Sequence, residues 1–515
     1  MNLCIQPACR GPRRKPLALC VSALFAIVIP GLSAASTWKV NTCDEGNSGD
    51  IPSKTGTLRF AAEHAATTGD TIDMHLLSCA DSKISLTTGS IGFAQDSLTI
   101  VGPGPTVLQI DASASYPGFP GDFRVFTHSG GGKLVVQDLG LSGGHVYHID
   151  PAYASKGGCL YSKGSVDLTN VTVTACGAQS TGNLARGGGV YALGDLKLTH
   201  GTLTDNGASG KPSAYGGGAY TKGKLTLDYS TLSGNHVAGT SYSHGGGAFA
   251  TGDLSASYST VSGNQAVGTL VSARGGGLLV GGNVTVTKST ISGNSSDGNF
   301  GGLLSVNDNS YASNTFSLYS STLSGNSAAK IVGGAYTNAG KIFIEHSTIA
   351  FNTAGAGKIT DYFAPGMAIG AVSSDTTIEV ESSIMSNNTY GTAENDFSVA
   401  INSITVGGSD NLVRNASGIS FFSSTITACP LLAPLRDNGG LTETHALFSG
   451  SPALDVGNLA DSGSTDQRGS AAINGMLDYL RVSGPIGDLD PRPDIGAYEM
   501  QQDEIVFNAG FDGCP

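Results

Sequence analysis

The sequence predicts an all-β fold, a right-handed parallel β-helix of about eleven or twelve coils, each roughly thirty residues long. Three observations support this prediction. Glycine clusters recur along the chain, a segment of alternating apolar and polar residues follows each cluster, and an asparagine turn follows that segment. The clusters begin at residues 157, 187, 216, 245, 275, 300 and 332.

The segments after the clusters have the pattern of short strands. In KLTLDYSTL (224–232), NVTVTKSTI (283–291) and KIFIEHSTI (341–349), apolar residues alternate with polar ones. The pattern has no long amphipathic helix between strands, which excludes leucine-rich and helical repeats. One repeat cannot enclose a core alone, so we expect successive repeats to stack, with parallel strands about 4.8 Å apart.

Equivalent residues of successive coils should form columns. One column consists of aromatic and apolar residues. Because Tyr and Leu occupy equivalent positions in it, we expect an interior or semi-interior packing ladder; stacking on a ligand is the alternative. Its members are Tyr161, Tyr191, Tyr220, Phe249, Leu279, Leu304 and Tyr336. A second column should bond coil to coil through its amides, at turn positions where asparagine tolerates left-handed φ. Its members are Asn206, Asn235, Asn264, Asn294, Asn326 and Asn352.

Charge and composition exclude one class of partner. The formal net charge is −13, only 13% of residues are charged, and the basic residues form no cluster, which disfavours nucleic acid as a partner. The single tryptophan, Trp38, excludes a tryptophan platform for sugars. Glycine is abundant, with 75 residues, and the uncharged composition is typical of a hydroxyl-rich surface.

The N-terminus has the pattern of an export signal. Basic residues precede an apolar run from Leu17 to Ile29, and small residues follow, so we expect residues 1–35 to be removed as a signal peptide. No other segment is apolar enough to predict a transmembrane helix in the mature chain.

Six cysteines remain after the signal peptide, a number typical of disulfides in an oxidising compartment. Pairing of nearest neighbours, one of fifteen connectivities, would give Cys43–Cys79, Cys159–Cys176 and Cys429–Cys514. Cys159 takes the place of a cluster glycine and Cys176 that of a column asparagine. We therefore expect a structural disulfide across one coil rather than a redox pair.

Both ends of the stack need covers, because exposed strand edges promote aggregation. At the N-terminus, TLRFAAEHAATTGDTIDM (57–74) predicts a short amphipathic helix that ends at Gly69 and lies over the first coil. The predicted organisation is a signal peptide (1–35), an N-terminal cap (36–75), β-helix repeats (76–428), an irregular C-terminal cap (429–500) and a short tail (501–515).

Three regions resemble known families. The TLR…A…GDTI arrangement partly resembles the N-terminal region of bacterial surface β-helix proteins with the CSLREA-type motif. The GGG…STISGN repeats resemble the polymorphic outer-membrane-protein type. CPLLAPLRDNGGLTETHALFSGSPALDVGN (429–458), TDQRG (465–469) and DIGAYE (494–499) resemble the choice-of-anchor Q domain. These resemblances imply an exported protein, secreted or associated with the cell surface or outer membrane of a Gram-negative bacterium.

One stripe of residues is the candidate ligand site. The residues just before the glycine clusters are polar, basic or aromatic and should face outward, which suits hydrogen bonding and stacking on a glycan. They are Lys156, Arg186, Tyr215, His244 and Arg274, continued by Asn299. The alternative is that these turn residues are simply solvated.

The acidic residues predict no catalytic site. Those of the repeats occur singly, and Asp195 and Asp253 look like turn residues. In the C-terminal motifs we expect Asp466, Arg468, Asp494 and Glu499 to fix the cap onto the last coil. The sequence predicts no cofactor and no metal site, although a set of aspartates leaves calcium as an alternative. That set is Asp455, Asp461, Asp466, Asp488, Asp490 and Asp494.

The functional expectation is an exported or cell-surface β-helix protein, without catalysis, that serves adhesion or interaction with a glycan or matrix, with polysaccharide or surface glycan as its partner. The alternative is a polysaccharide lyase or glycoside hydrolase that acts on the side of the β-helix. A glycosidase would need two carboxylates across the sugar bond, and a lyase would need a base beside a cation. No coil shows a convincing set of either kind, and the sequence leaves the oligomeric state open.

Overall fold

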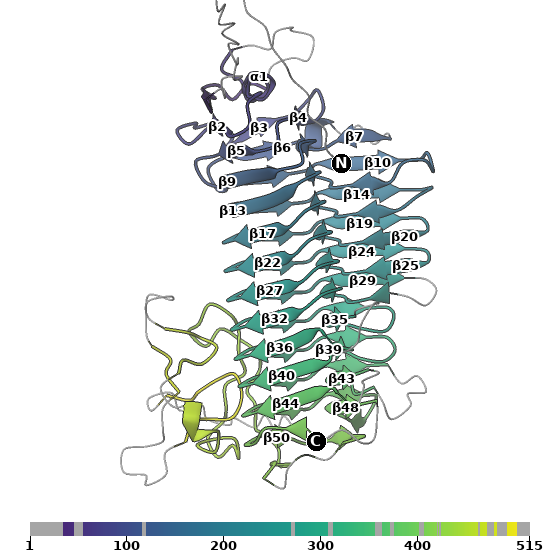
Figure 1. The fold of residues 1–515 in the computed structure, drawn as a ribbon, viewed down its shortest axis with the longest axis vertical. Coiled ribbons are helices and arrows are strands. Elements are labelled where there is room, and N and C mark those ends of the chain that lie inside the picture. The colour runs from purple at the N-terminus through teal and green to yellow at the C-terminus, as the bar shows by residue number, and fades with distance from the viewer. Residues whose placement is uncertain are drawn as a thin grey trace, which may run out of the picture. The chain divides into compact units, whose positions relative to one another are not determined.

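The computed structural model describes residues 34–45, 55–115, 120–268, 273–306, 313–355, 363–370, 375–400, 406–419, 421, 424–461, 464–470, 478–481 and 492–501. Most of the predicted signal peptide and tail lies outside these residues. Every helix and strand among these residues belongs to the unit Ala35–Pro515. This unit contains a parallel β-solenoid, which confirms the predicted all-β fold class (Figure 1).

The largest sheet has 23 strands and receives two strands from most coils. It contains β1 (Thr37–Lys39), β2 (Asp70–Asp73), β3 (Lys83–Ser85), β5 (Leu98–Val101), β6 (Gln109–Asp111), β9 (Lys133–Ser142), β13 (Ser165–Thr174), β17 (Leu196–Thr199), β18 (Thr202–Thr204), β22 (Leu225–Asp228), β23 (Thr231–Ser233), β27 (Leu254–Ser257), β28 (Thr260–Ser262), β32 (Val284–Thr287), β33 (Thr290–Ser292), β36 (Thr315–Tyr319), β37 (Thr322–Ser324), β40 (Lys341–Glu345), β41 (Thr348–Ala350), β44 (Thr377–Glu381), β45 (Ile384–Ser386), β49 (Val406–Gly407) and β50 (Leu412–Val413).

A second sheet has twelve strands, one from each coil, in agreement with the predicted number of coils. It contains β4 (Ile91–Phe93), β8 (Phe126–His128), β12 (Leu160–Ser162), β16 (Val190–Ala192), β21 (Ala219–Thr221), β26 (Ala248–Ala250), β31 (Leu278–Val280), β35 (Leu303–Ser305), β39 (Ala335–Thr337), β43 (Met367–Ile369), β48 (Phe397–Val399) and β51 (Ala416–Ser417).

Two further sheets complete the coils. One has eleven strands: β7 (Gly121–Phe123), β10 (His145–His148), β14 (Gly177–Ser180), β19 (Gly207–Gly210), β24 (His236–Gly239), β29 (Gln265–Gly268), β34 (Ser295–Ser296), β38 (Ser327–Ala328), β42 (Thr353–Ala354), β46 (Thr389–Tyr390) and β47 (Ala393–Glu394). The other has five: β11 (Ser155–Lys156), β15 (Ala185–Arg186), β20 (Ser213–Tyr215), β25 (Tyr242–His244) and β30 (Ala273–Arg274). Among the described strand pairs, only β7–β10 and β46–β47 are antiparallel.

The core lies inside the coils because inward side chains alternate with outward ones along each strand. Leu196, Leu225 and Leu254 are in register in β17, β22 and β27, and each is at most 2% exposed. Burial of one such leucine contributes about 1.5–3 kcal/mol, and stacking repeats it at every coil.

The 23-stranded sheet bends between its two strand positions. There one residue in each of ten successive coils, from β9 onward, has a left-handed backbone, with φ between 43° and 54°, and we call this set the left-handed column. It contains Asp138, Asn170, His200, Tyr229, Tyr258, Lys288, Ser320, His346, Ser382 and Asp410. No glycine occurs in it, so the strain of this conformation recurs along the stack.

The asparagine column forms the predicted amide ladder. Each Nδ2 donates to the Oδ1 of the next asparagine, as from Asn235 to Asn264 at 2.9 Å, and all six residues are fully buried. The left-handed φ expected of these asparagines is instead found one residue earlier, at positions such as Gly234 and Gly263. The asparagines themselves are therefore free to turn their amides into the stack.

Two predicted disulfides are present, Cys43–Cys79 and Cys159–Cys176. In the neighbouring coil the amide of Asn206 lies against Gly189, at the positions equivalent to Cys176 and Cys159. The disulfide thus replaces a glycine–asparagine contact. Cys429 is also disulfide-bonded, and its predicted partner Cys514 lies outside the described residues.

A short helix, α1 (Leu58–His64), packs at the first coils and buries Leu58, Ala61 and Ala62, as predicted. It is shorter than expected and ends at Ala65 rather than Gly69, which precedes β2 with φ of 93°. The described part of the chain also contains two 3₁₀ turns, Ser113–Ser115 and Leu459–Asp461. Among the described residues, no helix has the length and apolar character needed to cross a membrane.

The C-terminal region, residues 429–501, differs from its predicted position. Its described parts lie along the side of the solenoid, next to β32, β36, β40 and β44, rather than only over the last coil (Figure 1). Ala350, Ile384 and Leu412 of the solenoid form a second apolar core with Leu432, Leu447 and Ile495 of this region. At the last coil, Ile419 and Phe421 pack against the main core instead.

Candidate functional site

The predicted stripe exists as one column on the five-stranded sheet. Lys156, Arg186, Tyr215, His244 and Arg274 are paired in register from β11 to β30, and all five are half-buried. The continuation at Asn299 is wrong, because Arg274 forms its next bridge with the buried Phe300. The polar stripe therefore ends at Arg274.

The aromatic column lies on the outer face of the twelve-stranded sheet, beside the stripe. Tyr161, Tyr191, Tyr220 and Phe249 stack with ring centroids 5.2–5.3 Å apart and ring planes within 9° of parallel. The inner rings of this ladder are covered on both faces by their neighbours, and Tyr191 and Tyr220 are only 3% and 5% exposed. This geometry supports packing rather than a platform for stacking a ligand.

The stripe and the aromatic column are joined by cation–π contacts. The Nζ of Lys156 lies 5.5 Å from the centroid of Tyr191, and the Cζ of Arg186 lies 5.5 Å from that of Tyr220. A cation held against a ring keeps its side chain extended along the surface. These contacts orient the two charges without neutralising them.

The cations of the stripe have no anionic partner in the described structure. Among the described arginines, only Arg186 and Arg274 make neither a side-chain hydrogen bond nor an ion pair, and Lys156 also makes none. Burial lowers the pKa of Lys156, and the charges of Arg186, Arg124 and Lys222 lower it further. The stripe is therefore a locally positive surface on an acidic protein.

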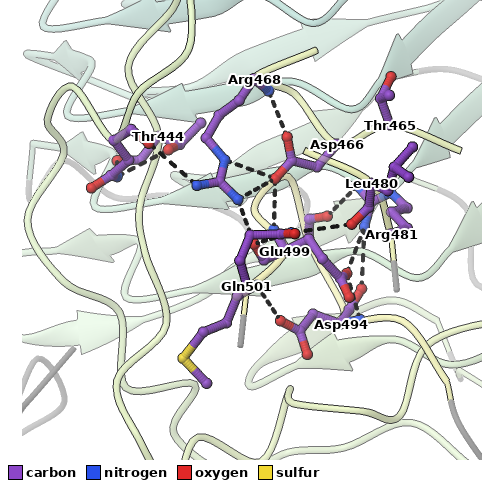
Figure 2. Close-up of polar contacts among 12 residues, drawn as sticks. Thr444, Thr465, Asp466, Arg468, Leu480, Arg481, Asp494, Glu499 and Gln501 are labelled. Carbon is purple, nitrogen blue, oxygen red and sulfur yellow. Dashed lines mark hydrogen bonds and ion pairs between the residues drawn. The ribbon is translucent and has the colours of Figure 1, made fainter. Parts of the chain in front are cut away.

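The C-terminal motifs form a buried polar network (Figure 2). Arg468 donates to Asp466 and to the carbonyl oxygens of Asn438 and Glu499, and its guanidinium lies 3.8 Å and 4.1 Å from the ring centroids of Tyr479 and Tyr498. Both Arg468 and Asp466 are completely buried.

The rest of this network is equally enclosed. Arg481 donates to the carbonyl oxygens of Asp494 and Gly496, and its Nη1 lies 3.8 Å from the Oε2 of Glu499. Burial raises the pKa of Glu499, and the nearby Asp494 carboxyl raises it further. Because these groups bond one another and are buried, we assign them a structural role.

The network also attaches the C-terminal region to the solenoid. The Nζ of Lys288 donates to the carbonyl oxygen and hydroxyl of Thr465, at 2.7 Å and 2.6 Å, and to the carbonyl oxygen of Asp466. Gln467 bonds two threonines of the solenoid, Thr290 and Thr322. This contact was not predicted from the sequence. A signal for it was present, because the outward position that is threonine in successive coils becomes Ile384 and then Leu412 in the last two coils.

Two of the aspartates considered for calcium, Asp466 and Asp494, accept backbone hydrogen bonds. The Asp494 carboxylate accepts backbone N–H bonds from Asp455 and Met500, and that of Asp466 accepts them from Arg468 and Glu499. Asp488 and Asp490 lie outside the described residues. In the repeats, Asp195 and Asp253 each accept a backbone N–H from the next coil, as expected of turn residues.

Comparisons with known proteins give only a distant similarity. No family model and no curated protein sequence matches the chain. Among solved structures, the crystal structure of pectate lyase Pel9A is similar, with 14% identity and a TM-score of 0.31 over 92% of this chain and 98% of the other. This similarity is too weak to assign residues or activity, so the function is argued from the site itself.

Proposed function

We propose that this protein is an exported or cell-surface β-solenoid that binds acidic polysaccharide, without catalysis, through the stripe Lys156, Arg186, Tyr215, His244 and Arg274. The observation that carries this proposal is the unpaired state of the three cations within the described structure. Other arginines of the solenoid, such as Arg124 and Arg414, have carboxylate partners. Cations left without a partner favour a ligand that brings its own anions.

The geometry favours a chain-like ligand. The stripe side chains repeat at the spacing of parallel strands, about 4.8 Å, which is close to the length of one sugar unit in an extended chain. Two neighbouring units can therefore bring carboxylate or sulfate groups to Lys156 and Arg186, and a unit three positions further along can reach Arg274. The rings of Tyr215 and His244 lie between Arg186 and Arg274. A surface of this kind suits adhesion to an acidic matrix.

Export is part of the proposal and has two supports. The N-terminal sequence has the pattern of a signal peptide, and the described structure contains two complete disulfides, which persist mainly in oxidising compartments. The resemblances to the choice-of-anchor Q domain and to the outer-membrane-protein type of repeat also belong to this proposal.

The test is binding of the purified mature chain to alginate, polygalacturonate and chondroitin sulfate, with neutral dextran as a control. Each charge-assisted hydrogen bond contributes about 1.5–3 kcal/mol, so we expect the double variant Arg186→Ala/Arg274→Ala to weaken binding by about a hundredfold or more. The control Lys197→Ala/Lys224→Ala removes two exposed charges, one in β17 and one directly before β22, and should leave binding nearly unchanged. Equal losses in both variants would contradict a specific stripe.

Polysaccharide cleavage is the second candidate function, and Lys156 is the observation that favours it. A lysine with a lowered pKa beside arginines resembles the base and cation that a lyase needs on a uronate chain. The absorbance of unsaturated products separates the two functions. If the protein is a lyase, Lys156→Arg should retain binding and lose turnover; if it only binds, the wild type releases no product.

A further inference from the structure

A cavity of about 450 Å³ opens where the solenoid meets the C-terminal region, on a face distinct from the stripe. We call it the corner groove. It is lined by His200, Tyr229, Ser230, Thr231, Tyr258, Thr260 and Leu441. Its volume lies in the range of small-molecule sites, and none of the lining residues that the structure describes is an acid, lysine or arginine.

One wall of the corner groove is part of the left-handed column. The rings of His200, Tyr229 and Tyr258 stack with centroids 4.9 Å and 5.1 Å apart, so their faces cover one another and all three residues line the groove. Burial raises the pKa of Tyr258 to about 12, and its phenol stays a neutral hydrogen-bond donor. Neither tyrosine hydroxyl bonds to another described residue.

The floor of the corner groove belongs to a column of threonines, and another pair in this column binds a side-chain amide. Two coils further along, the side-chain amide of Gln467 spans a threonine pair in register: its Nε2 donates to Thr290 at 2.8 Å and its Oε1 accepts from Thr322 at 2.7 Å. Thr231 and Thr260 are the same kind of pair, equally in register. Their hydroxyls have no partner among the described residues.

The corner groove therefore has a threonine pair that could hold an amide as Thr290 and Thr322 hold that of Gln467. Tyrosine hydroxyls and an apolar side chain belong to the same lining. Leu441 is 43% exposed and belongs to the same lining as this threonine pair. An acetamido group matches all three features, since its N–H and C=O can bond the two threonines and its methyl can contact leucine. The sugar ring beside it would present hydroxyls to the tyrosine edges.

We propose that the corner groove binds an N-acetylated amino sugar within a neutral glycan, with its acetamido group held between Thr231 and Thr260. The site is independent of the stripe in position and ligand chemistry. Its failure would leave the proposed binding of acidic polysaccharide intact, and the reverse also holds.

The test compares tri-N-acetylchitotriose with cellotriose, which has the same linkage and lacks the acetamido groups, by calorimetric titration of the purified mature chain. We expect saturable binding of the acetylated trimer only. Thr231→Val/Thr260→Val keeps the side-chain shape and removes the two hydroxyls, so it should weaken binding by about tenfold or more. Thr202→Val, one coil earlier in the same column, should have no effect.

Three results would overturn the proposal. They are equal affinity for the two trimers, unchanged affinity in Thr231→Val/Thr260→Val, or equal binding of a neutral dipeptide amide, which would make the groove a peptide site. The unfolding midpoint of each variant, measured in parallel, ensures that a loss of binding reflects the groove. Arg186→Ala/Arg274→Ala should bind the acetylated trimer like the wild type.

Discussion

At the scale of single residues, the solenoid is held together by buried amides. Asn264 accepts from the backbone N–H and Nδ2 of Asn235, and its own Nδ2 donates to Leu232 and Asn294. The ladder ends at Asp396, whose carboxylate accepts from Asn388 at 3.0 Å and 2.8 Å. Each amide thus satisfies buried groups in the coils next to it, which makes the ladder sensitive to any interruption.

We expect Asn264→Ala to destabilise the solenoid by about 2–4 kcal/mol, because the buried backbone N–H of Asn235 and one N–H of its side-chain amide lose their acceptor. Asn283→Ala, in an exposed asparagine of the adjacent coil, is the matched control and should cost less than about 1 kcal/mol. The measurement is denaturant unfolding followed by circular dichroism. Similar losses for the two variants would show that the ladder contributes little beyond its neighbours' packing.

The sequence predicted the columns whose residue type repeats, and missed those whose type varies. The asparagine ladder and the Cys159–Cys176 disulfide follow from alignment of the repeats. The left-handed column was invisible because His200, Tyr229 and Lys288 share only a backbone conformation, and none is a glycine. The corner groove, built partly on that column, could therefore not be located from the sequence.

At the scale of elements, the second strand position of the 23-stranded sheet changes its outward residue where the C-terminal region packs. Thr290, Thr322 and Thr348 are buried by that region, and the column then continues as Ile384 and Leu412. The prediction of β-helix repeats over residues 76–428 includes β45. It did not reveal that both faces of the strand are buried, because the covering segment is irregular and far away in the sequence.

Ile384→Thr restores the residue type of the preceding coils and removes apolar contact with the C-terminal region. Because Ile384 is only 1% exposed, we expect the attachment of that region to weaken by about 2 kcal/mol while the parallel stack stays folded. Limited proteolysis with mass mapping should then show faster cleavage within residues 429–501. Lys341→Thr, at an exposed position of β40, should leave the cleavage rate unchanged.

At the scale of the whole molecule, the side attachment of the C-terminal region concentrates buried ionisable groups at one interface. Glu499 and Asp494 have raised pKa values, chiefly because of burial, and lie in one network with Arg481 and Asp466. Lys288, which spans the interface, has its pKa lowered to about 8, also by burial. The stability of this assembly should therefore depend on pH in two opposing ways.

Below pH 8 the raised pKa values of Glu499 and Asp494 outweigh the pKa of the buried His445, which burial lowers to about 4 and which acts in the opposite direction. A carboxyl whose pKa is higher in the folded than in the unfolded state contributes stability that is present at acidic pH and lost as pH rises through the folded pKa. Lys288 acts in the opposite direction, but its contribution grows only between about pH 8 and its ordinary value of 10.5. We thus expect the C-terminal region to be more stable at pH 5 than at pH 8.

Glu499→Gln isolates this effect, since the amide stays neutral at every pH and can still accept the N–H bond that Asp494 donates to the Glu499 carboxylate. We expect the variant to lose less stability than the wild type between pH 5 and pH 8, by on the order of 1 kcal/mol. Hydrogen exchange of residues 464–470 and 492–501 at both pH values measures the attachment directly. A wild-type protein that becomes more protected at pH 8, or a variant with an unchanged pH profile, would show that Glu499 ionises in the folded state without cost.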